Sequence, residues 1–420
     1  MLEPARLPGT ERLPVARAEG VRDEGGAAAG INVLYMAQAG YQPDTFRAMA
    51  EAFQGETGIP VRINFTRYDD QYQKILTAAI APIGAYDVIT LDLIWVAEFA
   101  RKGYVVPLDG RLSPEVQADL DRPVLRAMQF DGRTWAMPFL ANFQLLFYNR
   151  RMLSEAGFER PPATLEELEH QMTVLKERGI VPYPWVDSWN QKEGLTCEFV
   201  WLTAAFGGEL FDHFNQPVFN RPPGIAALET MVRWLEKGLV HPVSLSADET
   251  TAKDLFVDGQ AAFTSNWTFQ DALMKDPARS RVAGEGEVGL LPVASQVYDP
   301  QRFFTVSVSG FQGLAIPANS RRQAEAWAFI RYVSSPEVQA QHLEEVPVWR
   351  SVREDPETLR RDPDMALKSV AIASVFHRPQ LVRYQEVSAV LQRYLHLALE
   401  GRMSPRQALD LAAEAVRPLL

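Results

Sequence analysis

The sequence predicts an α/β protein of two lobes, each with a β-sheet flanked by helices. The chain has 420 residues, which exceeds the usual limit for a single hydrophobic core. From Ile31 onward, short β-rich runs alternate with amphipathic helical patterns, which is typical of βαβ units and a mainly parallel sheet. Apolar residues make up 47% of the chain and charged residues 23%, and no apolar run is long enough to cross a membrane.

The first part of the fold is predicted to run strand, helix, strand, helix, strand. The strands are "INVLYM" at 31–36, "VRINFT" at 61–66 and "YDVITLD" at 86–92. Between the first two strands, one helical face carries Phe46, Met49, Ala50 and Phe53, and Asp44 is expected to cap this helix. The run "YDDQYQKILTAAI" at 68–80 supplies the second helix.

The later part of the chain is predicted to be richer in helix. Thr164 and Glu167 have the spacing of a capping box, and Ser404 followed by Pro405 begins a C-terminal helix. Strand-like runs return at 287–293 and 311–317. We expect residues 1–30, which lack the apolar core of a signal peptide, to be a disordered leader or a vector remnant.

Charge and ligand-forming residues exclude several classes of function. The net charge of −11 disfavours binding to nucleic acid or to anionic membranes. A single cysteine, Cys197, forbids an intramolecular disulfide, and the six histidines do not have the spacings that build zinc sites. We therefore expect no metal and no cofactor.

Polar side chains follow three successive predicted strands, where ligands bind in open parallel sheets. Gln38 and Tyr41 follow the first strand, Arg67 and Asp69 follow the second, and Asp92 ends the third. A carboxylate inside an apolar run must be paired, exposed or bound to a ligand. Asp92 is therefore a predicted ligand contact, although it can also cap the helix that follows it.

Six motifs, in order, resemble the extracellular solute-binding proteins of carbohydrate ABC transporters, in particular the branch that binds maltose, trehalose and related α-glucosides. They are "DLIWVAEFA", "MPFLANFQLLFYNRRML", "EGLTCEFVWLTAAFGGELFD", "AAFTSNWTFQDAL", "SGFQGLAIPANS" and "HRPQLVRYQEVSAVLQRYLHLALEG". The resemblance covers nearly all of 31–420. It implies a monomer of the type II periplasmic-binding-protein-like fold, with two α/β lobes, a ligand cleft between them and three crossings of the chain.

The same resemblance implies lobe boundaries, a location and a partner. One lobe is expected at 31–138 plus 292–333, and the other at 139–291 plus 334–420. The protein would act in the periplasm or outside the cell, where it would close on a sugar and dock on the permease subunits of an ABC importer. No catalytic activity is expected.

Several site residues are implied by their match to the family's motifs. Trp267 matches a stacking tryptophan, and Gly310 and Phe311 match a segment where relatives have Gly-Gly-Trp. Asn142 stands where α-glucoside binders often have Asp. The remaining matches are Glu193, Gly194, Arg350 and Arg378. The alternatives are core packing for Trp267, a loop role for Asn142, helix-terminal charge for Glu193 and surface ion pairing for both arginines. Cys197 is expected to be a small buried residue.

The chemistry of a sugar supports this interpretation independently. A pyranose has apolar C–H faces and a ring of hydroxyls, so its site needs flat aromatic surfaces and planar polar groups. Trp185, Trp189 and Trp267 fall in polar or Gly-rich segments, where we expect ligand contact rather than core packing.

Two other functions stay open at this point. A glycoside hydrolase could use two carboxylates among Asp69, Asp70, Asp92 and Glu193, although no acid is in an evidently apolar setting that would raise its pKa. A binding protein of the same fold could instead take a polyamine or another small solute, which the acidic balance and the aromatic residues permit.

Overall fold

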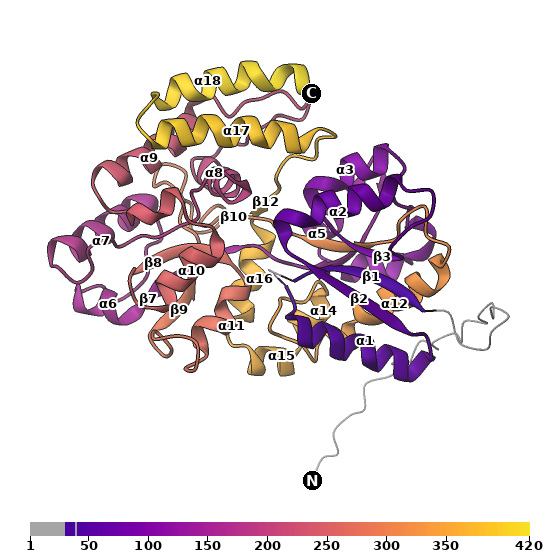
Figure 1. The fold of residues 1–420 in the computed structure, drawn as a ribbon. Helices are drawn as coiled ribbons and strands as arrows, with labels where there is room; N and C mark the ends of the chain where they lie inside the picture. Colours follow the sequence, from indigo (N-terminus) through magenta and orange to yellow (C-terminus); the bar gives the residue numbers. More distant parts are fainter. Residues whose placement is uncertain (1–29, 38–39) are drawn as a thin grey trace, which may run out of the picture.

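The computed structural model describes residues 30–37 and 40–420. Two α/β lobes lie side by side, with the first sheet in one and the C-terminal helices on the other (Figure 1). The predicted leader, apart from Gly30, and the site candidate Gln38 lie outside the described residues. No helix of the described chain is both long and apolar enough to span a membrane.

The first lobe contains a five-stranded sheet of order β2-β1-β3-β11-β6. The bounds are β1 Ile31–Met36, β2 Val61–Thr66, β3 Val88–Asp92, β6 Met137–Leu140 and β11 Gln312–Ala315. β1 pairs in parallel with β2 and β3, whereas β11 is antiparallel to β3 and β6. The opening strand-helix alternation predicted from the sequence is confirmed, and a segment from late in the chain completes the sheet.

The second lobe contains a three-stranded sheet of order β8-β7-β9. The bounds are β7 Gln144–Asn149, β8 Phe263–Trp267 and β9 Gly286–Gly289, and both pairings are antiparallel. The prediction of a mainly parallel sheet is therefore wrong for this lobe. Two short pairs complete the strands, one of β10 Ser307–Val308 with β12 Val375–Phe376 and one of β4 Gln129–Phe130 with β5 Arg133–Thr134.

Helices cover both sheets and form the outer layer of the second lobe. Their bounds are α1 Pro43–Thr57, α2 Tyr68–Ile80, α3 Leu93–Arg101, α4 Pro114–Asp119, α5 Arg122–Ala127, α6 Arg150–Glu155, α7 Leu165–Glu177, α8 Glu193–Ala205, α9 Pro222–Glu236, α10 Glu249–Val257, α11 Phe269–Lys275, α12 Gln323–Val333, α13 Pro336–Gln339, α14 Arg350–Arg353, α15 Pro356–Arg361, α16 Met365–Ala373, α17 Tyr384–Leu399 and α18 Pro405–Val416. α17 and α18 pack together over α9, and α17 also contacts α8 (Figure 1).

Helix starts follow the sequence signals with one exception. Thr164 and Ser404 accept hydrogen bonds from the backbone N–H groups of Glu167 and Gln407, so both predicted caps are confirmed. The predicted cap at Asp44 is wrong, because α1 begins at Pro43 and Asp44 pairs with Arg47 on the helix surface. The predicted apolar face of α1 is confirmed by the burial of all four of its members.

The chain passes between the lobes three times. It leaves the first lobe between β6 and β7, returns between β10 and β11, and leaves again after α12 toward β12 and α17. The segments near residues 141–143, 309–311 and 374–378 therefore lie close together. The hydrogen bonds from Gly310 N to Asn142 O (2.8 Å) and from Ser309 N to Phe376 O (3.1 Å) join them. The numerical lobe boundaries given above remain predictions.

Candidate functional site

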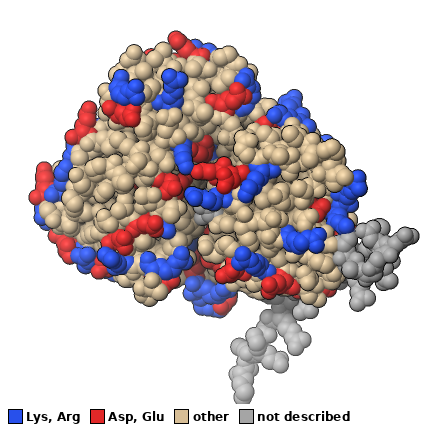
Figure 2. Space-filling model, viewed as in Figure 1, with Lys and Arg blue, Asp and Glu red and all other residues tan. Residues whose placement is uncertain are grey.

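A pocket lies between the two lobes and takes its lining from both. The space between its walls, including the part that is open to solvent, is about 710 Å³. The lining residues are Tyr68, Asp69, Asp92, Asn142, Lys192, Glu193, Gly194, Cys197, Asp248, Glu249, Thr250, Trp267, Phe269, Gly310, Gln312 and Arg378. Acidic and basic side chains gather where the lobes meet (Figure 2).

Strand ends and helix starts bring these side chains together. Asp92 is the last residue of β3, and Trp267 is the last residue of β8. Glu193 and Gly194 begin α8, and Glu249 begins α10. The walls of the pocket therefore consist of element termini, where polar backbone and side-chain groups remain available to a ligand.

Asp92 is both a helix cap and the partner of a buried arginine. One carboxylate oxygen, Oδ1, accepts from the backbone N–H of Ile94 (3.2 Å) and from Nη2 of Arg378 (2.9 Å). The other, Oδ2, accepts from the hydroxyl of Tyr68 (3.1 Å). Since Asp92 and Arg378 are each only 2% exposed, this ion pair joins the lobes in a setting that excludes water. The prediction that Asp92 contacts a ligand stays a prediction.

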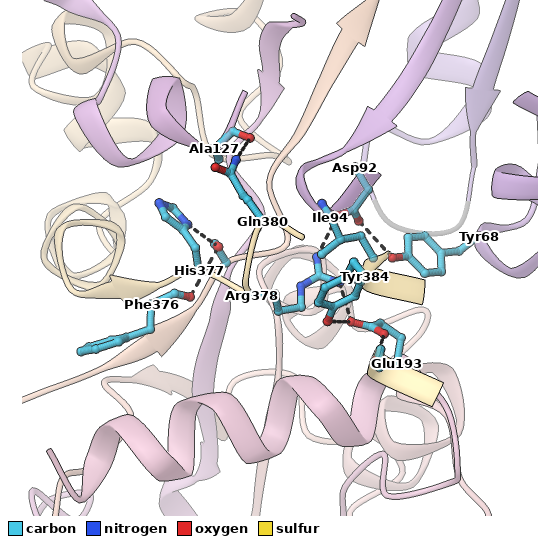
Figure 3. A network of polar contacts seen from close by, with 12 residues as sticks. Tyr68, Asp92, Ile94, Ala127, Glu193, Phe376, His377, Arg378, Gln380 and Tyr384 are labelled. Atoms are coloured by element: carbon cyan, nitrogen blue, oxygen red, sulfur yellow. Dashed lines mark hydrogen bonds and ion pairs between the residues drawn. The ribbon is translucent and has the colours of Figure 1, made fainter. Parts of the chain in front are cut away.

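Arg378 carries the network on to the second lobe, as Figure 3 shows. Its Nη1 donates to Oε1 of Glu193 (3.0 Å), which also accepts from the hydroxyl of Tyr384 (2.6 Å). The other oxygen of Glu193 accepts from Ser388 (2.7 Å). Burial is the largest single influence on Arg378 and opposes its charge, but Asp92, Glu193 and the other acidic neighbours together outweigh burial and raise the pKa of the guanidinium above its usual value.

A second ion pair crosses between the lobes at the surface. Lys192 Nζ lies 2.7 Å from Oδ2 of Asp69, and both side chains are 53% exposed. Such exposed pairs contribute about 0–1 kcal/mol, because water and salt screen them. The buried Arg378 network therefore makes the stronger connection between the lobes.

Trp267 is the main aromatic group of the pocket, with Phe269 beside it in the sequence. Its side chain rests on the backbone of Gly310, since a Cβ built at that glycine would lie 2.8 Å from a carbon of the indole ring. Gly194 has a related role, because a Cβ there would lie 2.9 Å from Oγ of Ser188 and 3.0 Å from Oε1 of Glu249. Both glycines are thus required by close approach.

We expect Gly310→Ala to lower stability by about 1–3 kcal/mol, the usual cost of overpacking. The added methyl group forces the ring of Trp267 or the crossing segment to move. Urea unfolding measures the loss, and near-ultraviolet circular dichroism reports the altered setting of the ring. Gly55→Ala is the matched control, because nothing lies within 4 Å of its added Cβ in helix α1 and helix propensity favours alanine. Equal stability of wild type and Gly310→Ala would contradict the proposed packing.

Asn142 offers an uncharged planar group to the pocket. Its Oδ1 accepts from the hydroxyl of Thr268 (2.9 Å), while its backbone carbonyl accepts from Gly310 N (2.8 Å). No described residue forms a hydrogen bond with its amide NH₂ group. That group is a donor that a ligand hydroxyl can use.

Glu249 is an acid in the pocket wall whose pKa is raised by burial, with the neighbouring charge of Asp248 adding to the shift. Within the described chain no lysine or arginine forms an ion pair with it. The expectation that no acid here lies in a setting that raises its pKa is therefore wrong. No local signal indicates this burial, because Glu249 follows the helix cap Asp248 and has the position of an ordinary first-turn acid.

Eight of the predicted site residues line the pocket, namely Asp69, Asp92, Asn142, Glu193, Gly194, Trp267, Gly310 and Arg378. Arg67 instead lines a neighbouring groove with Asp70, Lys74 and Thr250. Phe311 is fully buried with its ring against His377, and Tyr41 is fully buried against Phe139. Arg350 is exposed at the start of α14 and donates to the carbonyl of Ala118 (3.4 Å).

Two of the tryptophans expected at a ligand are core residues. Trp185 and Trp189 are 0% and 1% exposed, because the segment that carries them packs under the second lobe's helices. Trp185 stacks obliquely on Trp234 of α9, with ring centroids 5.6 Å apart. The prediction was wrong because the polar residues around both tryptophans suggested an exposed loop. Cys197 is buried as expected and lies in the pocket wall.

Sequence reasoning did not select several of the lining residues. They are Tyr68, Lys192, Asp248, Glu249, Thr250, Phe269 and Gln312. Two of them could have been found from the sequence. Lys192 directly precedes the predicted site residue Glu193, and Asp248 is the helix cap of α10. Gln312 follows the predicted Phe311 and lies on β11, whose register opposite Asp92 places it at the pocket.

One carboxylate cluster of the described chain has the geometry to hold a metal ion, formed by Asp271, Asp362 and Asp364. Lysine ammonium groups already occupy it. Lys368 lies 2.5 Å from Asp271 and 2.8 Å from Asp362, and Lys275 lies 2.5 Å from Asp364. The cluster is therefore an ion-pair network that ties α11 to α16.

Two α/β lobes that enclose a polar pocket and are joined by three crossings define the class of two-lobed ligand-binding proteins. The model of the bacterial extracellular solute-binding protein family matches residues 39–340, and the chain belongs to this family. It is thus a solute-binding protein of the kind that serves ABC transporters, and the family is described as extracellular.

Known proteins of this kind are similar to the chain over most of its length. The maltotriose-binding protein of Pyrococcus abyssi is 25% identical over 328 residues, which are 76% of this chain and 66% of that protein. Maltose-bound MalE3 of T. maritima superposes with a TM-score of 0.85 at 24% identity, covering 94% of this chain and 100% of the other. A solute-binding protein of Agrobacterium radiobacter in complex with ribitol gives 0.81 at 20% identity, covering 93% and 99%.

Proposed function

We propose that the chain binds a neutral carbohydrate in the pocket between its lobes and delivers it to the permease of an ABC importer. A disaccharide or short α-glucoside such as maltose or trehalose is the proposed ligand. The observation that carries this is the meeting of Trp267, the free amide of Asn142 and the guanidinium of Arg378 in one pocket. An aromatic face together with planar polar groups suits a pyranose ring.

Similar proteins support a polyhydroxylated ligand without specifying which one. The names quoted above mention maltotriose, maltose and ribitol, which share arrays of hydroxyl groups. A sugar ring differs from an open-chain polyol by its flat C–H face. Stacking on Trp267 would therefore favour the ring.

A polyamine or another cationic solute is the second candidate, and one observation favours it. The lining contains five carboxylates, Asp69, Asp92, Glu193, Asp248 and Glu249, but only two cations, Lys192 and Arg378. A positively charged ligand would balance this excess. Hydroxyl groups can also donate to the same carboxylates, so the neutral sugar remains our proposal.

A thermal-shift panel of maltose, trehalose, ribitol and spermidine tests the assignment. A ligand present at a thousandfold excess over its Kd stabilises the folded state by about 4 kcal/mol, because it binds only that state. We expect maltose or trehalose to give the largest shift, with no change on addition of EDTA. A shift with spermidine alone would transfer the proposal to cationic solutes, and a shift abolished by EDTA would contradict a metal-free site.

A further inference from the structure

Two buried carboxyl groups lie behind the pocket, in the second lobe. Asp187 and Glu198 are both 0% exposed. Asp187 accepts from the backbone N–H of Ser188 (2.7 Å) and from Nε1 of Trp185 (3.0 Å). Glu198 accepts from Nε1 of Trp201 (2.6 Å) and from Nε2 of Gln144 (2.5 Å). Ser188 and Gln144 thus bind Oδ1 of Asp187 and Oε1 of Glu198, whereas the two indole N–H groups bind the remaining oxygens, Oδ2 and Oε2.

Ser265 lies between the two carboxyl groups. Its Oγ is 2.7 Å from Oδ2 of Asp187 and also 2.7 Å from Oε2 of Glu198. A hydroxyl has one proton, so it can donate to only one of these oxygens. The second short contact is attractive only if the other carboxyl group is protonated and donates to Ser265. Proton counting alone therefore places one extra proton on the pair.

The groups that face the pair carry no positive charge. They are Gln144 from β7, Ser265 from β8, Cys197 and Trp201 from α8, Trp185 and Ser188 from the segment before α8, and Ser244, which accepts from the backbone N–H of Asp187 (3.1 Å). Within the described chain no lysine, arginine or histidine forms an ion pair with either carboxyl group. Burial raises the pKa of the Cys197 thiol, so this neighbour is also neutral.

The pair is directly connected to the walls of the pocket. Ser265 and Trp267 are two residues apart on β8, and Gln144 is the register partner of Trp267 on β7. Glu198 lies on α8, whose first turn presents Glu193 and Gly194 to the pocket. A change in the charge of the pair therefore acts on two opposite supports of the site, the end of β8 and the start of α8.

We propose that Asp187 and Glu198 share one proton through Ser265 and form a pH-sensitive support of the pocket. While the proton is present, the hydrogen bonds between the two carboxyl groups and Ser265 hold β8 against α8. When it is lost to hydroxide at alkaline pH, two like charges face each other in a buried site without a cation. Repulsion then loosens the end of β8, with Trp267, and the first turn of α8.

The direction of the pH dependence follows from the shifted acids. Burial raises the pKa of Glu198 to about 7, and burial together with the charge of Glu198 raises the pKa of Asp187 well above its usual value. A carboxyl group in the unfolded chain titrates near about 4. The folded state therefore binds the proton more tightly than the unfolded state does. The stability that this proton contributes is complete below about pH 4 and is lost as pH rises through about 7.

Glu198→Gln is the variant that tests this proposal. It is isosteric, keeps an acceptor for Trp201 and Ser265, and removes the second charge. Its new NH₂ group can donate to Oε1 of Gln144 once the Gln144 amide turns over, since that oxygen is now buried without a partner. Asp187 is then the only ionisable group of the pair, and the loss of its proton places one charge in the site instead of two. We therefore expect this variant to fold and to lack the pH response of the pair.

The experiment compares wild type with Glu198→Gln between pH 6 and pH 9. We expect the melting temperature of the wild type to fall by about 2–4 °C more than that of the variant, a shift within the range for a single interaction in a domain of this size. The infrared band of a protonated carboxyl group should be lost on the same pH scale in the wild type.

Hydrogen exchange measures the effect on the pocket itself. At pH 9 the amides of β8 and of the first turn of α8 should exchange faster in the wild type than in Glu198→Gln at the same pH, while at pH 6 the two proteins should match. Glu345→Gln is the control, because burial also raises the pKa of this acid, to about 8, and it does not line the pocket. This control should keep the faster exchange of β8 and of the first turn of α8 at pH 9. Equal pH profiles of wild type and Glu198→Gln, or equal exchange at pH 9, would overturn the proposal.

Discussion

Replacing Arg378 with Met is expected to lower the stability of the closed, folded protein by about 3–5 kcal/mol, which is the usual cost of removing one partner from a buried ion pair. Arg378 and Asp92 are each 2% exposed, so water cannot replace the lost guanidinium without opening the junction between the lobes. Glu193 loses the same partner, although Tyr384 and Ser388 still donate to it. Urea unfolding measures the loss, and small-angle scattering measures the opening.

Two further variants separate this buried network from the exposed ion pairs. Asp92→Asn combined with Arg378→Met removes the unpaired charge and should recover part of the stability. Arg383→Gln breaks the exposed pair with Glu386 and should leave stability nearly unchanged, because water and salt screen exposed pairs. If Arg378→Met were as stable as Arg383→Gln, the ion pair would not join the lobes in solution.

Replacing Trp267 with Ala should weaken binding of the sugar identified by the thermal-shift panel by roughly ten- to a hundredfold, or about 1–3 kcal/mol. Trp267 is the only tryptophan among the lining residues, and it comes from the opposite lobe to Asp92. A ligand that touches both lobes has a higher affinity for the closed state than for the open state. Only such a difference in affinity can shift the equilibrium between the two states. Isothermal titration calorimetry measures the affinity.

Trp327→Ala is the control for this experiment, because Trp327 lies on α12 and does not line the pocket. It should change the total tryptophan fluorescence but leave the Kd of the sugar unchanged. A further comparison, Trp267→Phe, keeps an aromatic face and should retain part of the affinity. Wild-type affinity in Trp267→Ala would exclude stacking on this ring.

The first sheet and its site residues could be predicted because their signals are local. The period of two in "VRINFT" and the apolar face of α1 determine element type within a few residues of chain. The rule that ligands bind beyond the ends of strands then selected Asp69 and Asp92, and both line the pocket. The family's motifs added Asn142, Glu193, Trp267 and Arg378 to the same pocket.

Other features depend on contacts between distant segments and carry no local signal. Trp185 and Trp189 are in polar sequence but are covered by helices from elsewhere in the second lobe. The acids Asp187 and Glu198 come together only through Ser265, which is 67 residues from Glu198 along the chain. Arg378 forms an ion pair with Asp92, which is 286 residues away along the chain. Pairing over such distances follows from topology, so a pattern within a short window cannot reveal it.

The position of β11 in the first sheet has a consequence for the order in which the protein is made. This strand lies between β3 and β6 and hydrogen-bonds to both, yet it is formed by residues 312–315. During synthesis, β3 and β6 leave the ribosome with an open gap between them. Non-local pairing of this kind slows folding and leaves strand edges exposed to other chains. The sheet of the N-terminal lobe is therefore completed only after residues 312–315 have been made, and until then β3 and β6 lack the strand that pairs with both.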